Sequence, residues 1–557
     1  MHDEFKKKRD TRSWWKEAVV YQIYPRSFKD ANGDGIGDLR GIIGQLDYIQ
    51  HLGVDAVWLN PVFVSPNVDG GYDIEDYYAI QPEFGAMADF DALLNGLHER
   101  GLRLILDIVV NHTSDKHPWF EASRQSTGNP YRDFYFWRPG AGKGPPNNWP
   151  SFFGGSAWQY DEKTGEYYLH LFSSKQPDLN WENPALREEV LNIMRFWLNK
   201  GVDGFRLDVI SAISKHTGFP DTDTGDFNET VRKYYTNGPR VTEFIRLLRE
   251  QVWNDYDMVA IGEGPGITPD TACLYVAEPY GLDIIFHFGH MFLDQGPGGR
   301  FDPVPWTLEA FKAVFNNWDN VFAATGWGSV FLGNHDFARM VSRWGNDREY
   351  LEQSATGLAT LLLSMRGTPF IFQGDEIGMT NITLNELSEF KDIDTQNGWR
   401  EAQQRGLTAV AFMEIANYAG RDNARTPMQW DASAGAGFSE STPWMPVNVN
   451  KNRINVAEQV RRPHSVLNYY IKMIALRKAN PVLIYGRYEQ IDSAPAPIFA
   501  YYRILKAEKW LILLNFSDVA STFDRDGLGT GELKISNYPD PPRSGLLRPW
   551  EAVVFSQ

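Results

Sequence analysis

The segment Arg103-Leu-Ile-Leu-Asp-Ile-Val-Val-Asn-His112 decides the fold class, because in it a short apolar run ends in a polar cluster. A helical pattern over 90–100 and Gly101 precede it. Short, fully apolar runs are typical of strands buried on both faces of a parallel sheet. The same unit of helix, turn and apolar run recurs with runs at 56–59, 204–207, 258–261 and 369–372. Such an alternation predicts βα units and an α/β fold.

Further apolar runs at 19–24, 284–288 and 329–332 bring the predicted strands to eight. Eight βα units predict a (β/α)8 TIM barrel that carries insertions. A doubly wound open sheet is the alternative. The absence of a Gly-rich dinucleotide-binding loop after the first strand disfavours it.

The barrel, as catalytic domain, is predicted over 12–112 and 185–480. Residues 113–184 are rich in Trp, Tyr, Gly and Pro and predict a loop-rich lid domain inserted after strand 3. A second insertion, 376–446, carries a helical pattern over 384–391. Residues 481–557 alternate in polarity around turns such as Asp526-Gly527, which predicts a C-terminal antiparallel β-sandwich domain.

Composition excludes several classes of protein. The 557 residues include 54 basic and 71 acidic side chains, a net charge of −17, which argues against a nucleic-acid partner. Cys273 is the single cysteine, so no disulfide or Cys-based metal site can form within the chain. No signal-like apolar segment begins the chain, and the apolar runs are far shorter than the ~18 residues of a membrane span. We expect a cytoplasmic monomer that binds no membrane.

Aromatic residues make up 14% of the chain. They suit either a large core or a surface that binds the flat faces of sugar rings, and composition alone does not separate the two.

Acidic residues end several of the predicted strands. Asp208, Glu263 and Asp336 stand at the ends of strands 4, 5 and 7, where the catalytic groups of such barrels gather. Two carboxyl groups about 5 Å apart can cleave a glycosidic bond with retention, one as nucleophile and the other as acid. Arg206 would keep Asp208 ionised, and negative neighbours would raise the pKa of Glu263. Each acid alone could merely cap a helix, but together they favour catalysis.

Segments 107–112, 204–208, 262–263 and 334–336 resemble the four ordered sequence blocks of the α-amylase superfamily, glycoside hydrolase family 13. Segments 22–28, 167–172, 177–182 and 421–430 are similar to its oligo-1,6-glucosidase and sucrose isomerase branch.

The resemblance implies that Asp208 is the nucleophile, Glu263 the general acid/base and Asp336 the stabiliser of the transition state. It implies that six residues hold the glucose unit at the cleavage point: Asp69, Tyr72, His112, Arg206, His335 and Arg421. Tyr72 would stack under the ring, and Phe153, Phe172 and Gln176 would line the pocket wall. For the two phenylalanines, packing inside the insert is the alternative.

The loop Asp30-Ala-Asn-Gly-Asp-Gly-Ile-Gly-Asp38 offers oxygen ligands at positions 1, 3 and 5 and a Gly at position 6, as hard cations require. It is not an EF-hand, because Gly41 replaces the Glu at position 12. The resemblance implies a structural Ca²⁺, or else Mg²⁺, held by Asp30, Asn32, Asp34, the carbonyl of Ile36, and Asp38. A metal-free Asx-turn loop is the alternative, and no organic cofactor is expected. His287 and His290 are interpreted as loop or rim residues that bind no metal.

Val209 after the nucleophile resembles the residue of α-1,6-preferring members. The segment Arg300-Phe-Asp-Pro-Val304 lacks the second arginine of the R-x-D-R-x stretch of sucrose isomerases, and Gly264 and Ala338 depart from typical oligo-1,6-glucosidases. We therefore expect a retaining, exo-acting α-glucosidase that releases glucose from the non-reducing end of short α-glucosides, leaning to α-1,6 linkages and with room for transglucosylation. A sucrose-active glucosyltransferase or isomerase that makes trehalulose or isomaltulose is the first alternative. A catalytically silent sugar-binding homologue is the second, against which the intact acids argue.

Overall fold

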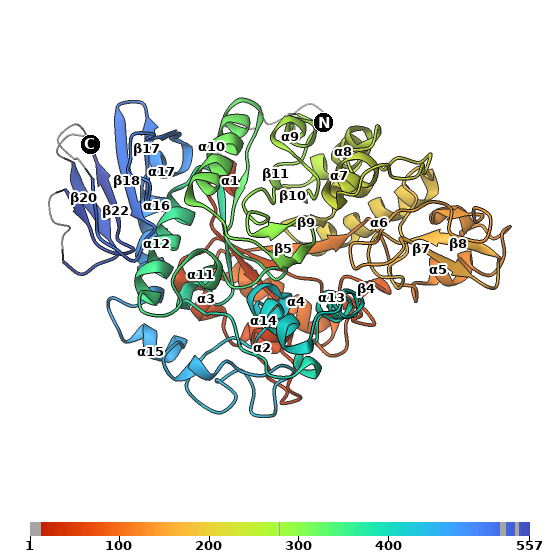
Figure 1. Ribbon diagram of the computed structural model, residues 1–557, viewed down its shortest axis with the longest axis horizontal. Helices are drawn as coiled ribbons and strands as arrows, with labels where there is room; N and C mark the ends of the chain where they lie inside the picture. The colour runs from red at the N-terminus through yellow and green to blue at the C-terminus, as the bar shows by residue number, and fades with distance from the viewer. Residues whose placement is uncertain (1–12, 278, 524–530, 541–544) are drawn as a thin grey trace.

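The computed structural model describes residues 13–277, 279–523, 531–540 and 545–557. The predicted first barrel residue, 12, and the Asp526-Gly527 turn lie outside the described residues. Figure 1 shows a central barrel with the predicted lid on one side and a β domain at the C-terminal end on the other.

Eight parallel strands form the barrel wall in the order β11-β10-β9-β5-β2-β1-β15-β14. They are β1 (Val20–Ile23), β2 (Ala56–Leu59), β5 (Arg103–Val109), β9 (Gly204–Asp208), β10 (Val259–Glu263), β11 (Ile284–Phe286), β14 (Ser329–Val330) and β15 (Thr368–Phe372). A bridge between Ile285 and Gly328 links the two outermost strands and closes the ring. The predicted (β/α)8 barrel is confirmed.

The barrel helices follow the predicted periodicity. They include α4 (Met87–Glu99), α6 (Pro184–Lys200), α8 (Val241–Gln251), α10 (Leu308–Thr325) and α12 (Leu351–Ser364). In α6, the side chain of Asn183 accepts a hydrogen bond from the N–H of Ala185 and caps the start. Gly201 ends the helix with a φ of 106°, a left-handed conformation that favours glycine. The helical segment before β2 is divided into α2 (Leu39–Ile43) and α3 (Leu46–Leu52).

The lid contains helix α5 (Pro118–Ser123) and a sheet of β6 (Trp137–Arg138), β8 (Glu166–Leu169) and β7 (Trp158–Asp161), in that order. Its apolar cluster, built around Trp149 and Leu171, also takes in Phe219 and Tyr235 from the segment 214–240 after β9. That segment carries helix α7 (Phe227–Thr230) and a π-helical turn, η4 (Val231–Tyr235). Residues after strand 4 therefore complete the lid, which the sequence patterns did not indicate.

The insertion after β15 differs from its prediction. In place of a helix over 384–391 there is one 3-10 turn, η7 (Leu387–Glu389), followed by α13 (Ile393–Gln404) and α14 (Ala409–Ala419). Asp392 accepts a hydrogen bond from the N–H of Thr395 and so sets the start of α13 beyond the predicted segment. These helices share a small apolar cluster with Phe301 from the hairpin of β12 (Gln295–Gly296) and β13 (Gly299–Pro303).

The C-terminal region is an antiparallel sheet in the order β16-β17-β18-β22-β20, as predicted. Its strands are β16 (Arg487–Gln490), β17 (Ile498–Leu505), β18 (Glu508–Asn515), β22 (Ala552–Ser556) and β20 (Glu532–Ser536). One face contacts α12. The other packs, through Leu513 and Val553, against Phe523 and Leu547, which lie beside the short sheet of β19 (Ser521–Thr522) and β21 (Leu546–Leu547). Within the described part of the chain, every helix is too short or too polar to cross a membrane.

Candidate active site

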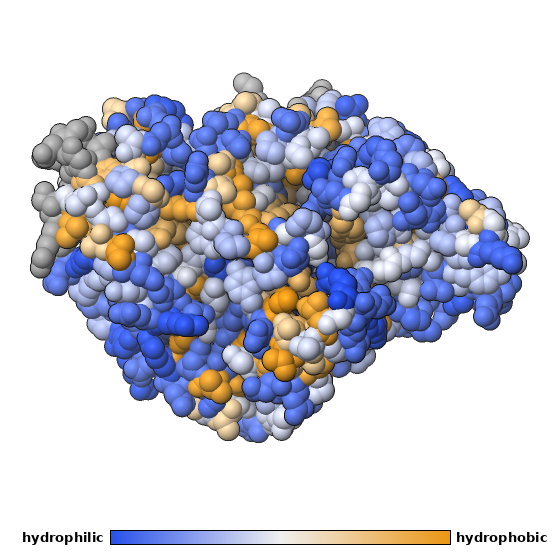
Figure 2. Space-filling model, in the orientation of Figure 1, coloured by the Kyte–Doolittle hydropathy of each residue, from blue (hydrophilic) through white to orange (hydrophobic). Residues whose placement is uncertain are grey.

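The candidate catalytic carboxylates lie at the carboxyl ends of adjacent strands. Asp208 is the last residue of β9 and Glu263 the last of β10, and the two strands pair directly. Because parallel neighbours end at the same edge, both side chains project into one mouth. Figure 2 shows a hollow on this face, between the lid and the barrel.

Arg206 joins three carboxyl groups beneath the mouth. Its Nη1 lies 2.9 Å from Asp107 Oδ1 and 2.6 Å from Asp208 Oδ1, and its Nη2 lies 2.6 Å from Glu263 Oε1. The Arg206 side chain is only 2% exposed, so little solvent screens these contacts. One guanidinium therefore fixes the nucleophile and the acid predicted from the sequence in a single arrangement.

Burial raises the pKa of Asp208, of Glu263 and of Asp107, the last to about 6, although the charge of Arg206 opposes each shift. Three carboxyl groups share one guanidinium charge, so full ionisation would leave an uncompensated negative charge in a buried site. The cluster therefore favours retention of a proton near neutral pH. A retained proton is what a general acid needs.

Asp336 is held in the opposite way. Its Oδ1 accepts hydrogen bonds from Arg421 Nη1 at 3.1 Å and from Arg425 Nη2 at 3.0 Å. Burial alone would raise the pKa of Asp336, but His335 and these two arginines hold it well below its usual range. Asp336 therefore stays ionised while the Asp208–Glu263 pair can hold a proton.

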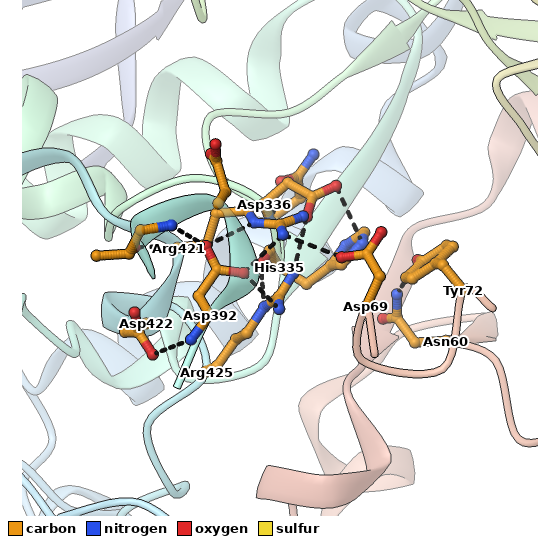
Figure 3. Close-up of polar contacts among 12 residues, drawn as sticks. Asn60, Asp69, Tyr72, His335, Asp336, Asp392, Arg421, Asp422 and Arg425 are labelled. Atoms are coloured by element: carbon orange, nitrogen blue, oxygen red, sulfur yellow. Dashed lines mark hydrogen bonds and ion pairs between the residues drawn. The ribbon is translucent and has the colours of Figure 1, made fainter. Parts of the chain in front are cut away.

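Figure 3 shows how Arg421 is fixed from both sides. Its Nη2 lies 3.0 Å from Asp69 Oδ1 and 2.6 Å from Asp392 Oδ1. Asp392 also lies 3.3 Å from Arg425 Nη1, and Gln176 Nε2 donates to Asp69 Oδ2 at 3.1 Å. Asp392 and Arg425 were not among the predicted site residues. Arg425 lies in the quoted 421–430 segment, whereas no motif marks Asp392.

His335 lies between an aromatic wall and the mouth. Its ring stacks on Tyr72 with centroids 5.2 Å apart, and Tyr72 donates a 2.7 Å hydrogen bond to Asp107 Oδ2. Gln22 Nε2 lies 2.8 Å from His335 Nδ1, which places the imidazole proton on Nε2. Burial lowers the pKa of His335 to about 3, so the ring is neutral. Nε2 is buried and lies 3.2 Å from Asp336 Oδ2, so the imidazole faces the carboxylate of Asp336.

The lid supplies the remaining wall. His112 Nε2 lies 3.2 Å from Gln176 Nε2, and the His112 ring lies 5.1 Å from Phe172. Phe153 contacts Phe172 edge-on and lies 5.1 Å from the guanidinium of Arg421. The structure thus brings all twelve predicted catalytic and sugar-binding residues around one mouth.

A buried ion pair joins the two lid segments, 113–184 and 214–240, next to Asn111 of the barrel. Lys215 Nζ lies 2.8 Å from Asp178 Oδ2 and 3.2 Å from Asn111 Oδ1, and both charged side chains are fully buried. Breaking such a pair leaves an uncompensated buried charge and costs about 3–5 kcal/mol. The lid segment that carries Gln176 is therefore held firmly beside His112.

The loop 30–38 is closed by its own hydrogen bonds. Asp30 Oδ2 accepts from the N–H of Gly35 and from Ser439 Oγ, and Asp38 Oδ2 accepts from the N–H of Ala31. Asn32 and Asp34 are exposed. No group of three or more His, Cys, Asp or Glu side chains among the described residues is arranged to hold a metal. The oxygen-rich set still has the chemistry that Ca²⁺ prefers, so the metal stays a prediction.

His287 and His290 lie in the loop after β11, as predicted, but the alternative rim position is wrong. Both are buried, because the chain after β11 turns beneath α10: His287 stacks on Trp318 at 4.1 Å, and His290 Nε2 lies 2.7 Å from the carbonyl of Phe331.

A (β/α)8 barrel whose strand ends hold an Asp and a Glu on one arginine, with a third carboxylate opposite, has the machinery of a glycoside hydrolase. The alpha amylase catalytic domain model matches residues 22–486. The chain belongs to the alpha-amylase family, in its oligo-1,6-glucosidase and sucrose isomerase branch.

Individual relatives are similar to this chain over almost its whole length. The oligo-1,6-glucosidase of Parageobacillus thermoglucosidasius is 52% identical over 555 residues, covering 98% of this chain and 99% of that protein. The oligo-1,6-glucosidase of Bacillus cereus is 49% identical over 98% of this chain and 99% of its own length. Among solved structures, the trehalulose synthase of Pseudomonas mesoacidophila superposes with a TM-score of 0.95 at 44% identity, over 98% of this chain and 99% of that one. An isomaltulose synthase variant from Erwinia rhapontici, in complex with its natural substrate sucrose, superposes with a TM-score of 0.95 at 43% identity, over 98% of this chain and 99% of that one.

Proposed function

We propose that this protein is a retaining, exo-acting α-glucosidase that releases glucose from the non-reducing end of short α-glucosides and prefers α-1,6 linkages. The observation that carries the proposal is the contact of Asp208 and Glu263 with the same guanidinium, that of Arg206. The full-length similarity to oligo-1,6-glucosidases supports the substrate class.

The chemistry is a double displacement. The Asp208 carboxylate attacks the anomeric carbon while protonated Glu263 gives its proton to the glycosidic oxygen, so the bond to the leaving sugar breaks and a glucosyl ester of Asp208 forms. Glu263, now ionised, takes a proton from water, whose oxygen attacks the same carbon and releases glucose and free Asp208. A sugar hydroxyl in place of water gives transglucosylation. Ionised Asp336 stabilises the positive charge that develops on the ring.

We propose that the pocket is closed at the end away from the acid. The Arg421–Asp69 ion pair, with Gln176 on Asp69, crosses its floor. An oligosaccharide cannot pass between these buried, ion-paired side chains. One glucose unit therefore fits beyond the point of cleavage. This geometry supports exo action.

Sucrose isomerisation is less well supported, although solved relatives catalyse it. Arg300 makes contacts within the protein: its Nε lies 2.8 Å from Asp394 Oδ2, and its Nη1 donates a hydrogen bond to the carbonyl of Asp336 at 2.7 Å. Pro303 stands where the isomerase stretch has its second arginine. Hydrolysis is therefore the main reaction proposed for sucrose as well.

Chromatography of the products from isomaltose, maltose and sucrose tests this function. We expect glucose from isomaltose as the fastest reaction. Trehalulose or isomaltulose as the main product from sucrose would overturn the hydrolase assignment. In parallel, Asp208→Asn should reduce hydrolysis of an aryl α-glucoside at least ~10³-fold with an unchanged melting temperature, since it removes the nucleophile. We also propose a structural Ca²⁺ in the loop 30–38; a cytoplasmic location and a monomeric state stay predictions.

A further inference from the structure

A second cavity lies outside the active site, among η7, α13 and α14, with a volume of about 280 Å³. Its lining combines three aromatic side chains, of which Trp399 is partly exposed while Phe390 and Phe412 are buried behind it, with exposed polar side chains, Ser388, Gln396 and Arg400. Trp399 and Phe412 pack together with ring centroids 5.5 Å apart. In Figure 2, hydrophobic residues reach the surface where Figure 1 places α14.

We propose that this cavity binds one sugar unit of an oligosaccharide, as a carbohydrate site separate from the catalytic pocket. A pyranose ring has apolar C–H faces that pack on aromatic rings and a rim of hydroxyl groups that need hydrogen bonds. The cavity offers the partly exposed ring of Trp399 for the first and the exposed polar side chains for the second. Its volume lies just under the range of about 300–1,000 Å³ typical of small-molecule sites, which suits one ring and not an extended chain.

The polar side retains hydrogen-bonding capacity. Gln396 Nε2 donates to the carbonyl of Phe390 at 3.3 Å, which leaves its amide oxygen available. Arg400 Nη1 donates to Asn397 Oδ1 at 2.6 Å, and its guanidinium carries further N–H donors. Ser388, Gln396 and Arg400 are all exposed.

Helix α13 separates this cavity from the active site. On one side, Asp392 contacts Arg421, Asp394 contacts Arg300, and Asn397 Nδ2 donates to the carbonyl of Phe153 at 3.0 Å. Gln396 and Trp399 line the cavity on the other side. The two sites are therefore about one helix diameter, ~10 Å, apart. A sugar bound in the cavity would keep an oligosaccharide close to the catalytic mouth and raise its local concentration.

The test uses ¹⁹F NMR of the full-length Asp208→Asn variant labelled with 5-fluorotryptophan and titrated with isomaltotriose. The resonance missing from a Trp399→Phe sample identifies Trp399. We expect this resonance to shift and saturate below about 50 mM isomaltotriose. No shift over this range would overturn the proposal. A shift with sulfate and none with isomaltotriose would overturn the sugar assignment in favour of an anion.

Because α13 also contacts the active site, a second variant separates the two sources of a shift. Ser388→Leu narrows the cavity from its exposed side without touching α13. It should raise the concentration for half-saturation of the Trp399 shift at least fivefold, whereas Ser126→Leu, at an exposed serine of the lid, should not. An equal midpoint in all three proteins would assign the shift to the active site and overturn the proposal. This proposal depends on the proposed function only for the choice of probe, isomaltotriose. Hydrolysis of an aryl α-glucoside measures the proposed function separately. In that assay Ser388→Leu should retain the wild-type KM.

Discussion

The backbone N–H of Val209 donates a 3.0 Å hydrogen bond to Oε2 of Glu263, so the residue after the nucleophile also positions the acid. Val209 has a φ of 44°, in the left-handed region. This conformation costs a β-branched residue about 1–3 kcal/mol, which the surrounding packing must offset. The strained turn aims one N–H at the catalytic carboxyl and packs the Val209 side chain in the apolar cluster of the lid.

Val209→Thr should lower the ratio of isomaltose to maltose hydrolysis rates by about tenfold, since one polar group in such a site is worth about 1–3 kcal/mol. Threonine is also β-branched, so the turn and its N–H bond should persist. The kcat/KM values for the two disaccharides measure the ratio. Val231→Thr, which buries a hydroxyl in the same lid cluster away from the nucleophile, is the control. An unchanged ratio in Val209→Thr would show that this residue does not decide linkage.

Asp392→Asn should lower kcat/KM for aryl α-glucosides by about 10–100-fold, because Arg421 loses one of the carboxylates that fix it and a small displacement of a substrate-holding group is costly. Most of the effect should fall on KM. Asparagine still caps α13, so the change removes charge and little else. Asp226→Asn, at the exposed N-cap of α7, is the matched control and should be silent. A wild-type KM for Asp392→Asn would mean that Asp69 and Asp336 suffice to hold Arg421.

The strands were predictable because each is a short apolar run, and the catalytic carboxylates because they end those runs. The role of Asp392 was not predictable, since it lies 29 residues before Arg421 and their contact exists only in the folded chain. The lid segment 214–240 was missed for a similar reason. Phe219 and Tyr235 follow no strand or helix period and become a core only against Trp149 from the other half of the lid.

Calcium should raise the melting temperature of EDTA-treated protein by several degrees, because a ligand at about 100 times its Kd stabilises the folded state by about 2.7 kcal/mol. Asp34→Ala should abolish this response. Asp34 also accepts a hydrogen bond from the N–H of Ile36, so Asp34→Ala changes the loop even without metal. The effect of Ca²⁺ on Asp34→Ala is therefore measured against the same variant without Ca²⁺. Scanning fluorimetry with and without CaCl₂ gives both differences. A melting temperature that does not respond to Ca²⁺ in the wild type would favour the metal-free loop.

Asp375, buried behind the site, should make the protein less stable as pH rises. Burial raises its pKa to about 7, against an ordinary value of 3.8 in the unfolded chain. The folded state therefore holds a proton that the unfolded state releases, so the stabilisation is present at pH 4 and is lost as pH rises through 7. Its size is of the order of 4 kcal/mol at most. Asp375→Asn mimics the protonated acid and should melt at a higher temperature than wild type at pH 8, and by a clearly smaller margin at pH 5, where most of the stabilisation is still present. The exposed Asp492→Asn should show no such difference, and equal effects of Asp375→Asn at the two pH values would mean that the folded protein keeps Asp375 ionised throughout.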